Sequence, residues 1–383
     1  MVFPEGFSEL LAESVGPAQA GSTLEALSAE PSVSVRLNPA KIRTCPFPDA
    51  ANVPWSPWGF LLKERPVFTL DPLFHAGCYY VQDSSAMYVG EVFRRVSGYL
   101  QRGATLLDLC AAPGGKTTDV AASLRERLGE QFSLLANEVM RSRYSILRSN
   151  VQTWGEARVG TVSRDPSAFG NTPLFDFILS DVPCSGEGMF RKDDRAVAEW
   201  SPETVRFCAA RSRRILADIW PALKPGGILL YATCTFNHFE NDDTVAWAAD
   251  ELGADILPPE AEGPGMATRC GRLLLPGEVP GEGQFVAALR KNGTYEASRR
   301  ADVFTLFRAE HPVEAFPDYP RWDLDRETAL RYLHGDALTL PPEAPAGPLL
   351  LCYQGQPLGP GKNLGKRCNN LYPKNKRIRM DIR

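Results

Sequence analysis

The chain has 383 residues, of which 44% are hydrophobic and 23% are charged, so it can bury the cores of two or three domains and is not disordered. Its net charge of −4 excludes a protein whose whole surface is basic and binds nucleic acid. No apolar run approaches the ~20 residues that span a bilayer, and the start carries Glu5 and Glu9 instead of a basic signal region, so we expect a cytoplasmic protein with no membrane contact.

The first region, residues 1–70, has a short helical pattern at residues 7–11 and a strand pattern at residues 34–38. A loop dense in proline and tryptophan follows at residues 46–57. We expect a small α+β module that binds RNA on the substrate side, with Arg36 of the predicted strand as a candidate contact.

The second region, residues 71–291, alternates strand and helix patterns, which is typical of a parallel sheet with helical crossovers. Buried strands are predicted over residues 104–109, 132–136, 175–180 and 227–232, and helices over residues 117–127 and 203–223. The second of these helices is expected to stop before Pro225 and the two glycines that follow it. The fold class is therefore α/β with a doubly wound, Rossmann-like sheet, whose ligands bind at the carboxyl ends of the strands.

The third region, residues 292–383, contains short apolar runs and glycine turns that indicate a small β-rich domain. Its end is basic: residues 361–383 hold eight basic residues and one acidic residue, or +7, so the other 360 residues carry −11. Apolar and amide residues interleave these charges as in a folded surface, although a solvated charge run is the competing interpretation. The candidate RNA contacts in this region are Lys362, Lys366, Arg367, Lys374 and Lys376.

A turn rich in small residues follows the first strand of the second region. It reads Cys110-Ala111-Ala112-Pro113-Gly114-Gly115-Lys116-Thr117. Cys110 stands where a P-loop requires its first glycine, and the dinucleotide pattern G-x-G-x-x-G is absent. A tight turn of small residues at a helix start still lets a ligand approach the backbone, and S-adenosylmethionine suits that geometry.

Two carboxylates follow later strands of the same region. Glu138, at the end of the second strand, could accept both ribose hydroxyls of S-adenosylmethionine, and Asp165 could accept from its adenine amino group. Taken singly, each would be an exposed loop acid.

The nine cysteines form no C-x-x-C pair and no histidine stands at ligand spacing, so neither a metal site nor a disulfide framework is predicted. Most of these cysteines are expected to be small buried side chains. Cys184 and Cys234 differ, because each follows a predicted strand. Since these two strands are neighbours in such sheets, about 4.8 Å apart, both thiols should share one crevice.

An ordered set of motifs resembles the NOL1/NOP2/Sun family of RNA cytosine-5 methyltransferases. The motifs are residues 109–117, Asn137-Glu138, residues 181–188, residues 200–203 and residues 233–235. The likeness covers residues 30–290, and residues 353–359 resemble the carboxyl-terminal PUA-like RNA-binding region of the bacterial rRNA members. Val182 and Gln284 depart from the usual pattern and touch none of the expected chemistry.

The resemblance implies that Cys234 adds to carbon 6 of cytosine, which makes carbon 5 nucleophilic toward the methyl donor. Cys184 would then assist breakdown of the adduct and product release. The addition also needs a proton or hydrogen bond at N3 and the amino group of the ring, and Asp181 is placed to supply it as a neutral acid. Lys116 is expected to bind Asp181 or the ligand.

The expected function is therefore the formation of 5-methylcytosine in RNA by a monomer. Ribosomal RNA or the small ribosomal subunit is the predicted substrate, and tRNA is the alternative. The target base must leave any helix, and Arg191 and Lys192 follow the cysteine motif closely enough to contact the phosphates beside it. Two other classes of function are alternatives. One is a P-loop NTPase, which Cys110 opposes, and the other is a noncatalytic RNA-binding scaffold, which the intact Asp181, Cys184 and Cys234 oppose.

Overall fold

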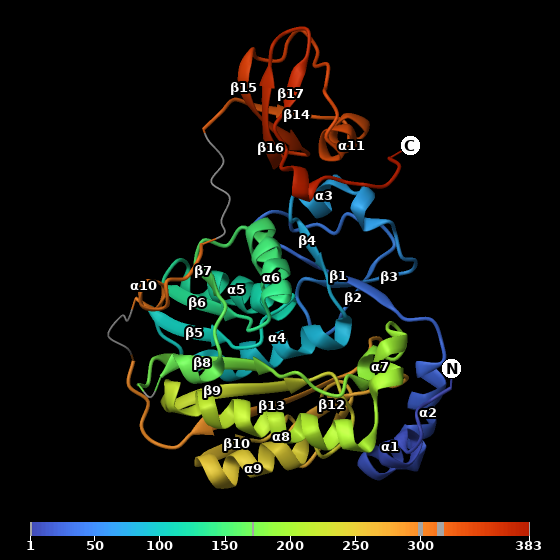
Figure 1. Cartoon of the computed structure of the whole chain (residues 1–383), viewed down its shortest axis with the longest axis vertical. Helices are drawn as coiled ribbons and strands as arrows, with labels where there is room; N and C mark the ends of the chain where they lie inside the picture. The colour runs from blue at the N-terminus through green and yellow to red at the C-terminus, as the bar shows by residue number, and fades with distance from the viewer. Residues whose placement is uncertain (1, 171, 298–301, 312–317, 383) are drawn as a thin grey trace.

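The computed structural model describes residues 2–170, 172–297, 302–311 and 318–382, and within them the chain forms three β-sheets with helices packed against them (Figure 1). The first part contains α1 Phe7–Val15, α2 Pro17–Leu27, β1 Val33–Leu37, β2 Ala51–Asn52, β3 Gly59–Leu62, α3 Pro72–His75 and β4 Tyr79–Val81. The last part contains α10 Val303–Phe307, β14 Arg321–Asp323, α11 Arg326–His334, β15 Gly347–Tyr353, β16 Gln356–Asn363 and β17 Cys368–Asn370.

The central part forms the largest sheet. Its first half consists of α4 Ser84–Val96, β5 Ala104–Asp108, α5 Gly115–Leu128, β6 Phe132–Asn137, α6 Arg141–Trp154, β7 Val159–Val162 and β8 Phe175–Asp181. Its second half consists of α7 Asp194–Glu199, α8 Pro202–Ile219, β9 Leu223–Thr233, α9 Asp242–Leu252, β10 Ala254–Leu257, β11 Met266–Ala267, β12 Arg272–Leu274 and β13 Gln284–Lys291.

The strands of the central sheet follow the order β11-β12-β13-β9-β8-β5-β6-β7, and β10 pairs with β13. From β9 to β7 the neighbours are parallel, whereas β13 runs antiparallel to β9. Because β5 pairs with β6 on one side and β8 on the other, the order of the strands reverses there, and ligands bind at such a switch point. The doubly wound α/β class is confirmed.

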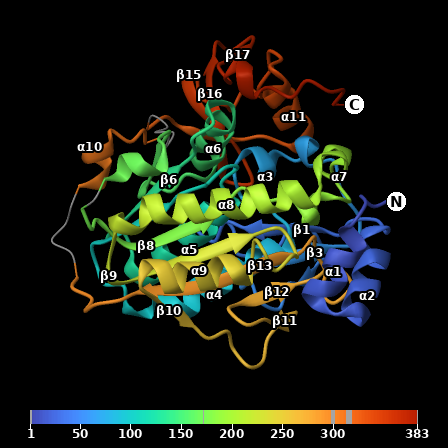
Figure 2. The same ribbon diagram turned by 60° about the horizontal axis from the view of Figure 1, so that its bottom comes forward.

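Both faces of the central sheet are covered by helices. Successive strand residues point to opposite faces, so Leu107 and Ile178 pack in one buried cluster with α8 and α9, while Leu106 and Phe177 pack in another with α4, α5 and α6. Figure 2 shows α8 and α9 lying across one side of the sheet. The alternation explains why these strands read as continuous apolar runs.

One boundary in this sheet differs from the prediction. The helix expected over residues 203–223 ends as an α-helix at Ile219, and β9 already begins at Leu223. Pro221 is the physical reason, because proline lacks the backbone N–H that continues a helix and restricts the residue before it. The prediction assigned that stop to Pro225 instead.

The amino-terminal sheet has the order β2-β3-β1-β4, so it includes a strand that lies beyond residue 70. The carboxyl-terminal sheet has the order β14-β15-β16-β17. The two share one buried cluster, in which Val35 and Leu37 lie with Tyr332 and Leu349. Figure 1 shows the carboxyl-terminal part stacked above α3 and β4.

The segment that follows β13 returns to the central sheet before it enters the carboxyl-terminal sheet. Thr161 of β7 donates to the Glu310 carbonyl over 2.8 Å, and the Glu310 amide donates back over 2.9 Å. Residues 302–311 therefore cover the edge of β7, which protects an otherwise open strand. In the described ranges, no helix combines the length and apolar character needed to cross a bilayer.

Candidate active site

The turn after β5 has the shape expected of a ligand cradle. Ala111 and Ala112 are buried, Cys110 is half-buried, and the Ala112–Pro113 peptide is cis. Gly114 has a φ of 109°, a left-handed value that glycine adopts without steric cost, and α5 begins at the next residue. The turn thus presents backbone and a helix start to the carboxyl edge of the sheet, where a ligand can approach closely.

Asp108, the last residue of β5, lies beside the turn and has a carboxylate oxygen that S-adenosylmethionine could bind. Its Oδ2 accepts from Thr117 Oγ1 over 2.6 Å, whereas its buried Oδ1 has no hydrogen-bond partner in the described chain. Burial raises the pKa of Asp108 to about 7, since water no longer stabilises the charge. S-adenosylmethionine carries an ammonium group that can donate to such an oxygen, so the residues fit this group.

Glu138 and Asp165 lie at the carboxyl ends of β6 and β7. Glu138 is buried, accepts from the Met140 amide over 2.9 Å, and forms an ion pair of 3.2 Å with Arg143. Asp165 is exposed, and its Oδ1 accepts from the backbone and hydroxyl of Ser167, which lower the pKa of Asp165. Both carboxylates lie at the carboxyl edge of the sheet, as the turn does. Their roles toward the ribose and the adenine stay predictions.

The two cysteines after β8 and β9 meet. Cys184 Sγ and Cys234 Sγ lie 3.3 Å apart, because β8 and β9 are parallel neighbours that end at the same edge. The hydrogen bond with Cys234, together with burial, raises the pKa of Cys184 well above its ordinary value. Cys184 therefore keeps its proton at neutral pH and can donate it to the sulfur of Cys234. We call residues 182–188 and 234–240, the loops that hold these sulfurs, the cysteine crevice.

Lys116 and Asp181 form an ion pair at the same edge. Lys116 Nζ donates to Asp181 Oδ2 over 2.8 Å. Burial opposes the lysine charge, but the Asp181 carboxylate outweighs it and raises the pKa of Lys116. The prediction that Lys116 binds Asp181 is met. The role of Asp181 as a proton donor to the ring stays a prediction.

Two buried glutamates join the loops of the cysteine crevice. Glu240 accepts from the Ser185 amide over 2.9 Å, from the Ser185 hydroxyl, and from Asn237 Nδ2 over 2.8 Å. Glu187 accepts from the Phe236 amide over 2.6 Å, from Asn237 Nδ2 over 2.9 Å and from Trp200 Nε1 over 3.0 Å. Each carboxylate therefore ties the loop after β8 to the loop after β9.

Sequence reasoning missed both glutamates. Glu187 lies inside the motif at residues 181–188, which was a usable signal, whereas nothing local distinguishes Glu240 from a surface acid. Gly188 in the same motif also has a packing reason, because an added Cβ would lie 2.5 Å from the Glu282 carbonyl oxygen. Its amide donates to the Cys234 carbonyl over 2.8 Å, so close backbone approach brings the loops together.

Two predicted RNA contacts are wrong. Arg36 has an exposed fraction of 0%, and it donates to Gln82, Thr118 and the Gly115 carbonyl. It fixes the amino-terminal sheet to the start of α5 and cannot reach a phosphate. The side chain of Arg191 is 7% exposed and is held by Glu282 over 2.7 Å, so it is also a structural residue.

The other predicted RNA contacts lie at or near the surface. Lys192 is 31% exposed, although Glu282 lies 3.1 Å from it. Lys362 and Lys366 are exposed in and after β16, and Arg367 and Lys374 are exposed beyond them, while Lys376 is half-buried. Cys368, Tyr372 and Ile378 are buried between these charges, so the basic end is part of a folded domain and not a solvated run.

The fold and this site define the class of the protein, a Rossmann-like methyltransferase. A family model described as 16S rRNA methyltransferase RsmB/F matches residues 99–290. The N-terminal domain of 16S rRNA methyltransferase RsmF matches residues 3–84, and the methyltransferase RsmF PUA domain matches residues 319–378. The chain therefore belongs to the RsmB/F family of 16S rRNA methyltransferases, which confirms the resemblance seen in its motifs.

Individual relatives agree with this assignment. The ribosomal RNA small subunit methyltransferase F of Cronobacter sakazakii is 35% identical over 340 residues, which cover 83% of this chain and 67% of that protein. Its namesake from Pectobacterium atrosepticum is 34% identical over 76% of this chain and 62% of its own length. The chain thus spans about two thirds of the curated relatives it matches. A solved methyltransferase homologue from Pyrococcus horikoshii is 28% identical, with a TM-score of 0.63, over 76% of this chain and 95% of that one.

Proposed function

We propose that this protein transfers a methyl group from S-adenosylmethionine to carbon 5 of a cytosine in 16S ribosomal RNA. The observation that carries the proposal is the pair of sulfurs 3.3 Å apart, at the same sheet edge as the small-residue turn and the Lys116–Asp181 pair. Membership of a 16S rRNA methyltransferase family supports the choice of substrate.

In this proposal the thiolate of Cys234 attacks carbon 6 of the target cytosine and forms a carbon–sulfur bond, because carbon 5 is otherwise a poor nucleophile. N3 of the ring takes up a proton from the Lys116–Asp181 pair, and the Asp181 carboxylate accepts a hydrogen bond from the amino group. The electron density released into the ring makes carbon 5 nucleophilic.

When bound in the turn, S-adenosylmethionine supplies the methyl group that carbon 5 receives. Residues 110–116 would hold it at the backbone, with Glu138 at the ribose and Asp165 at the adenine. A water molecule then takes up the carbon 5 proton, N3 returns its proton to the Lys116–Asp181 pair, and the carbon–sulfur bond breaks with its electron pair going to Cys234. Cys184 assists this step because its proton can be donated to the departing sulfur.

We also propose that the chain works as a cytoplasmic monomer of three parts, predicted at residues 1–70, 71–291 and 292–383, whose outer parts position RNA. The first boundary moves beyond β4, because that strand pairs with β1 in the amino-terminal sheet. The exposed basic residues Lys362, Lys366, Arg367 and Lys374 support RNA contact by the third part. The buried cluster shared by the first and third parts supports their acting as one surface.

Bisulfite sequencing of ribosomal and transfer RNA from a strain lacking this gene tests the proposal. We expect one or more 16S rRNA cytosines to lose methylation, and the purified protein to restore it with S-adenosylmethionine. Loss confined to tRNA would move the substrate to the alternative class. Unchanged methylation, with no transfer by the purified protein, would favour a noncatalytic RNA-binding scaffold.

A further inference from the structure

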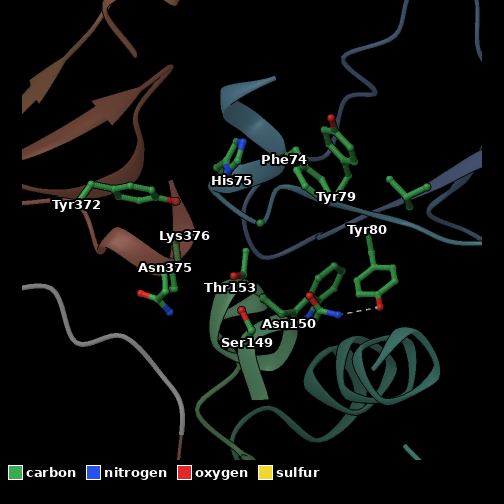
Figure 3. A pocket seen from close by; sticks show the side chains of 13 residues that line it. Phe74, His75, Tyr79, Tyr80, Ser149, Asn150, Thr153, Tyr372, Asn375 and Lys376 are labelled. Atoms are coloured by element: carbon green, nitrogen blue, oxygen red, sulfur yellow. Dashed lines mark hydrogen bonds between the residues drawn. The ribbon is translucent and has the colours of Figure 1, made fainter. Parts of the chain in front are cut away.

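A cavity of about 350 Å³ lies where the three parts of the chain meet (Figure 3). Its walls come from α3 and β4 of the amino-terminal part, from α6 of the central part, and from the segment after β17. It shares no lining residue with the cysteine crevice, so it is a second site. Its size is at the lower end of small-ligand pockets and suits a single nucleotide.

The cavity offers aromatic surface from two parts of the chain. Phe74 and Tyr80 are half-buried on the amino-terminal side, and Tyr372, which is only 6% exposed, lines the opposite side. The ring of Tyr372 is braced by Tyr332, whose centroid is 5.3 Å away. Figure 3 shows these rings on separate sides of the cavity. Rings of this kind stack on unpaired nucleobases without requiring a particular base.

The polar groups of the cavity match the edges of a base. Asn150 Nδ2 donates to Tyr80 Oη over 3.2 Å and to the Pro113 carbonyl over 2.8 Å, which leaves its Oδ1 as an acceptor without a partner in the described residues. The amide of Asn375 forms no hydrogen bond within the same residues, so it can both donate and accept. Ser149 adds a hydroxyl from α6.

The charge of the cavity favours a nucleic acid over a cationic or neutral peptide. Lys376 lines it and the exposed Lys374 stands beside it, while none of the described lining residues is acidic. Phosphates on either side of a bound base would meet this basic segment.

From this combination we propose that the cavity binds an unpaired nucleobase of the RNA substrate, at a nucleotide other than the one that is methylated. The inference rests on the proposed function, because it presupposes an RNA substrate. It deepens that function by assigning a second splayed base, held at the junction of the three parts. Tyr80 and Asn150 also contact Pro113 of the cofactor turn, so the bound base lies directly behind that turn.

The test fills the cavity from its exposed rim. Ser149→Trp places a large ring over the opening, and Ala217→Trp makes the same change at an exposed position of α8, on the other face of the central sheet. Overlapping oligonucleotides that together cover 16S rRNA identify the tightest binder of the wild-type protein. We expect Ser149→Trp to weaken that binding by about 5- to 150-fold, the range for one stacked base, and Ala217→Trp to leave it unchanged.

A scan with single abasic nucleotides then locates the bound base. At one position other than the methylated cytosine, we expect an abasic nucleotide to lower the affinity of the wild-type protein by a similar factor. At that position the abasic nucleotide should not lower the affinity of Ser149→Trp further, since the two changes remove the same contact. Melting temperature and S-adenosylmethionine binding of Ser149→Trp should match the wild type, which shows that the variant is folded.

Three results would overturn the proposal. In the first, Ser149→Trp binds RNA as tightly as the wild type does. In the second, abasic nucleotides lower its affinity at every position as much as they lower that of the wild type. In the third, it loses affinity for small ribosomal subunits but not for naked RNA, which indicates a protein occupant. If the wild type methylates its RNA and the abasic scan is flat, the cavity proposal fails alone. If the scan behaves as expected but no cytosine is methylated, the proposed function fails alone.

Discussion

The cysteine crevice and the basic surface of the carboxyl-terminal part differ in how their side chains are held. In the crevice, two buried glutamates and a close glycine contact fix the loops so that the sulfurs lie 3.3 Å apart. On the basic surface, Lys362, Lys366, Arg367 and Lys374 are exposed side chains in solvent.

The difference reflects what each surface is asked to do. Covalent chemistry depends on the position of single atoms, and small displacements cost large factors in rate. Phosphate attraction depends on the number of charges, and each contributes modestly and is screened by salt. A single substitution in the crevice should therefore lower the reaction rate by a large factor. Each substitution on the basic surface should lower the RNA affinity by a small one.

The largest effect is expected from Cys234→Ala. Loss of the attacking sulfur should abolish methyl transfer, while S-adenosylmethionine binding stays, because the cofactor turn lies after a different strand. Filter assays of methyl transfer and calorimetric titration of the cofactor measure the two separately. Substantial transfer by this variant would contradict the assignment of the nucleophile.

Cys184→Ala should halt the reaction later. We expect a covalent protein–RNA species that survives denaturing electrophoresis, because the adduct forms but the carbon–sulfur bond is not broken efficiently. The double variant with Cys234→Ala serves as its control and should form no such species. Trapping by Cys234→Ala instead would reverse the roles of the two sulfurs.

Glu240→Ala should disturb the crevice without touching either sulfur. It removes the acceptor of the buried Ser185 amide, at a cost of about 1–3 kcal/mol, whereas Asn237 Nδ2 keeps its hydrogen bond to Glu187. We expect a lower melting temperature and a lower kcat with little change in KM for RNA, because the loops lose their alignment. Glu240→Gln, which keeps one oxygen acceptor, should recover part of the loss.

Glu251→Ala, on the exposed side of α9, is the matched control and should change neither property. A loss of kcat that disappears when the rate is divided by the folded fraction of Glu240→Ala would indicate general unfolding instead of a positioning role.

Neutralising the basic surface should produce a smaller, salt-dependent effect. The quadruple variant with alanine at positions 362, 366, 367 and 374 should bind RNA more weakly, and the slope of log affinity against log salt should fall by about 1 for each lost phosphate contact. The folded neighbours Tyr372 and Ile378 make these substitutions preferable to deletion of the segment.

Arg102→Ala with Arg290→Ala offers a control of the same type. Both arginines are exposed, one just before β5 and the other near the end of β13, away from the catalytic edge. An identical drop in slope for both sets would mean that overall charge, and not this surface, sets the affinity.

The smallest effect is a pH dependence of stability. Burial raises the pKa of Glu240 to about 7, so the folded state favours its neutral form. This contribution is present in full below the ordinary carboxyl pKa and is lost as the pH rises through about 7. Between pH 5 and 8 the melting temperature should therefore fall less steeply for Glu240→Gln than for the wild type. Equal pH dependence of the two melting temperatures would contradict the assignment.

The strand and turn assignments around the site could be predicted because they depend on local patterns. The apolar runs before Cys110, Asp181 and Cys234 each form a parallel strand, and strands four and five of the prediction are the neighbours β8 and β9. Pro221 was overlooked as a helix stop because the stronger Pro225-Gly226-Gly227 signal follows it. Arg36 and Arg191 were misplaced because a basic residue looks the same in sequence whether it pairs with a buried acid or with a phosphate.

By itself the sequence determined the doubly wound sheet, the family, the two sulfurs and the turn, since each is encoded within a short continuous segment. Tertiary structure alone decided that Glu240 joins the crevice, that Arg36 is buried, and that α3, α6 and the carboxyl-terminal segment enclose a common cavity. These contacts join residues dozens to hundreds of positions apart, and whether a polar side chain meets solvent or a buried partner depends on which segments the folded chain brings beside it.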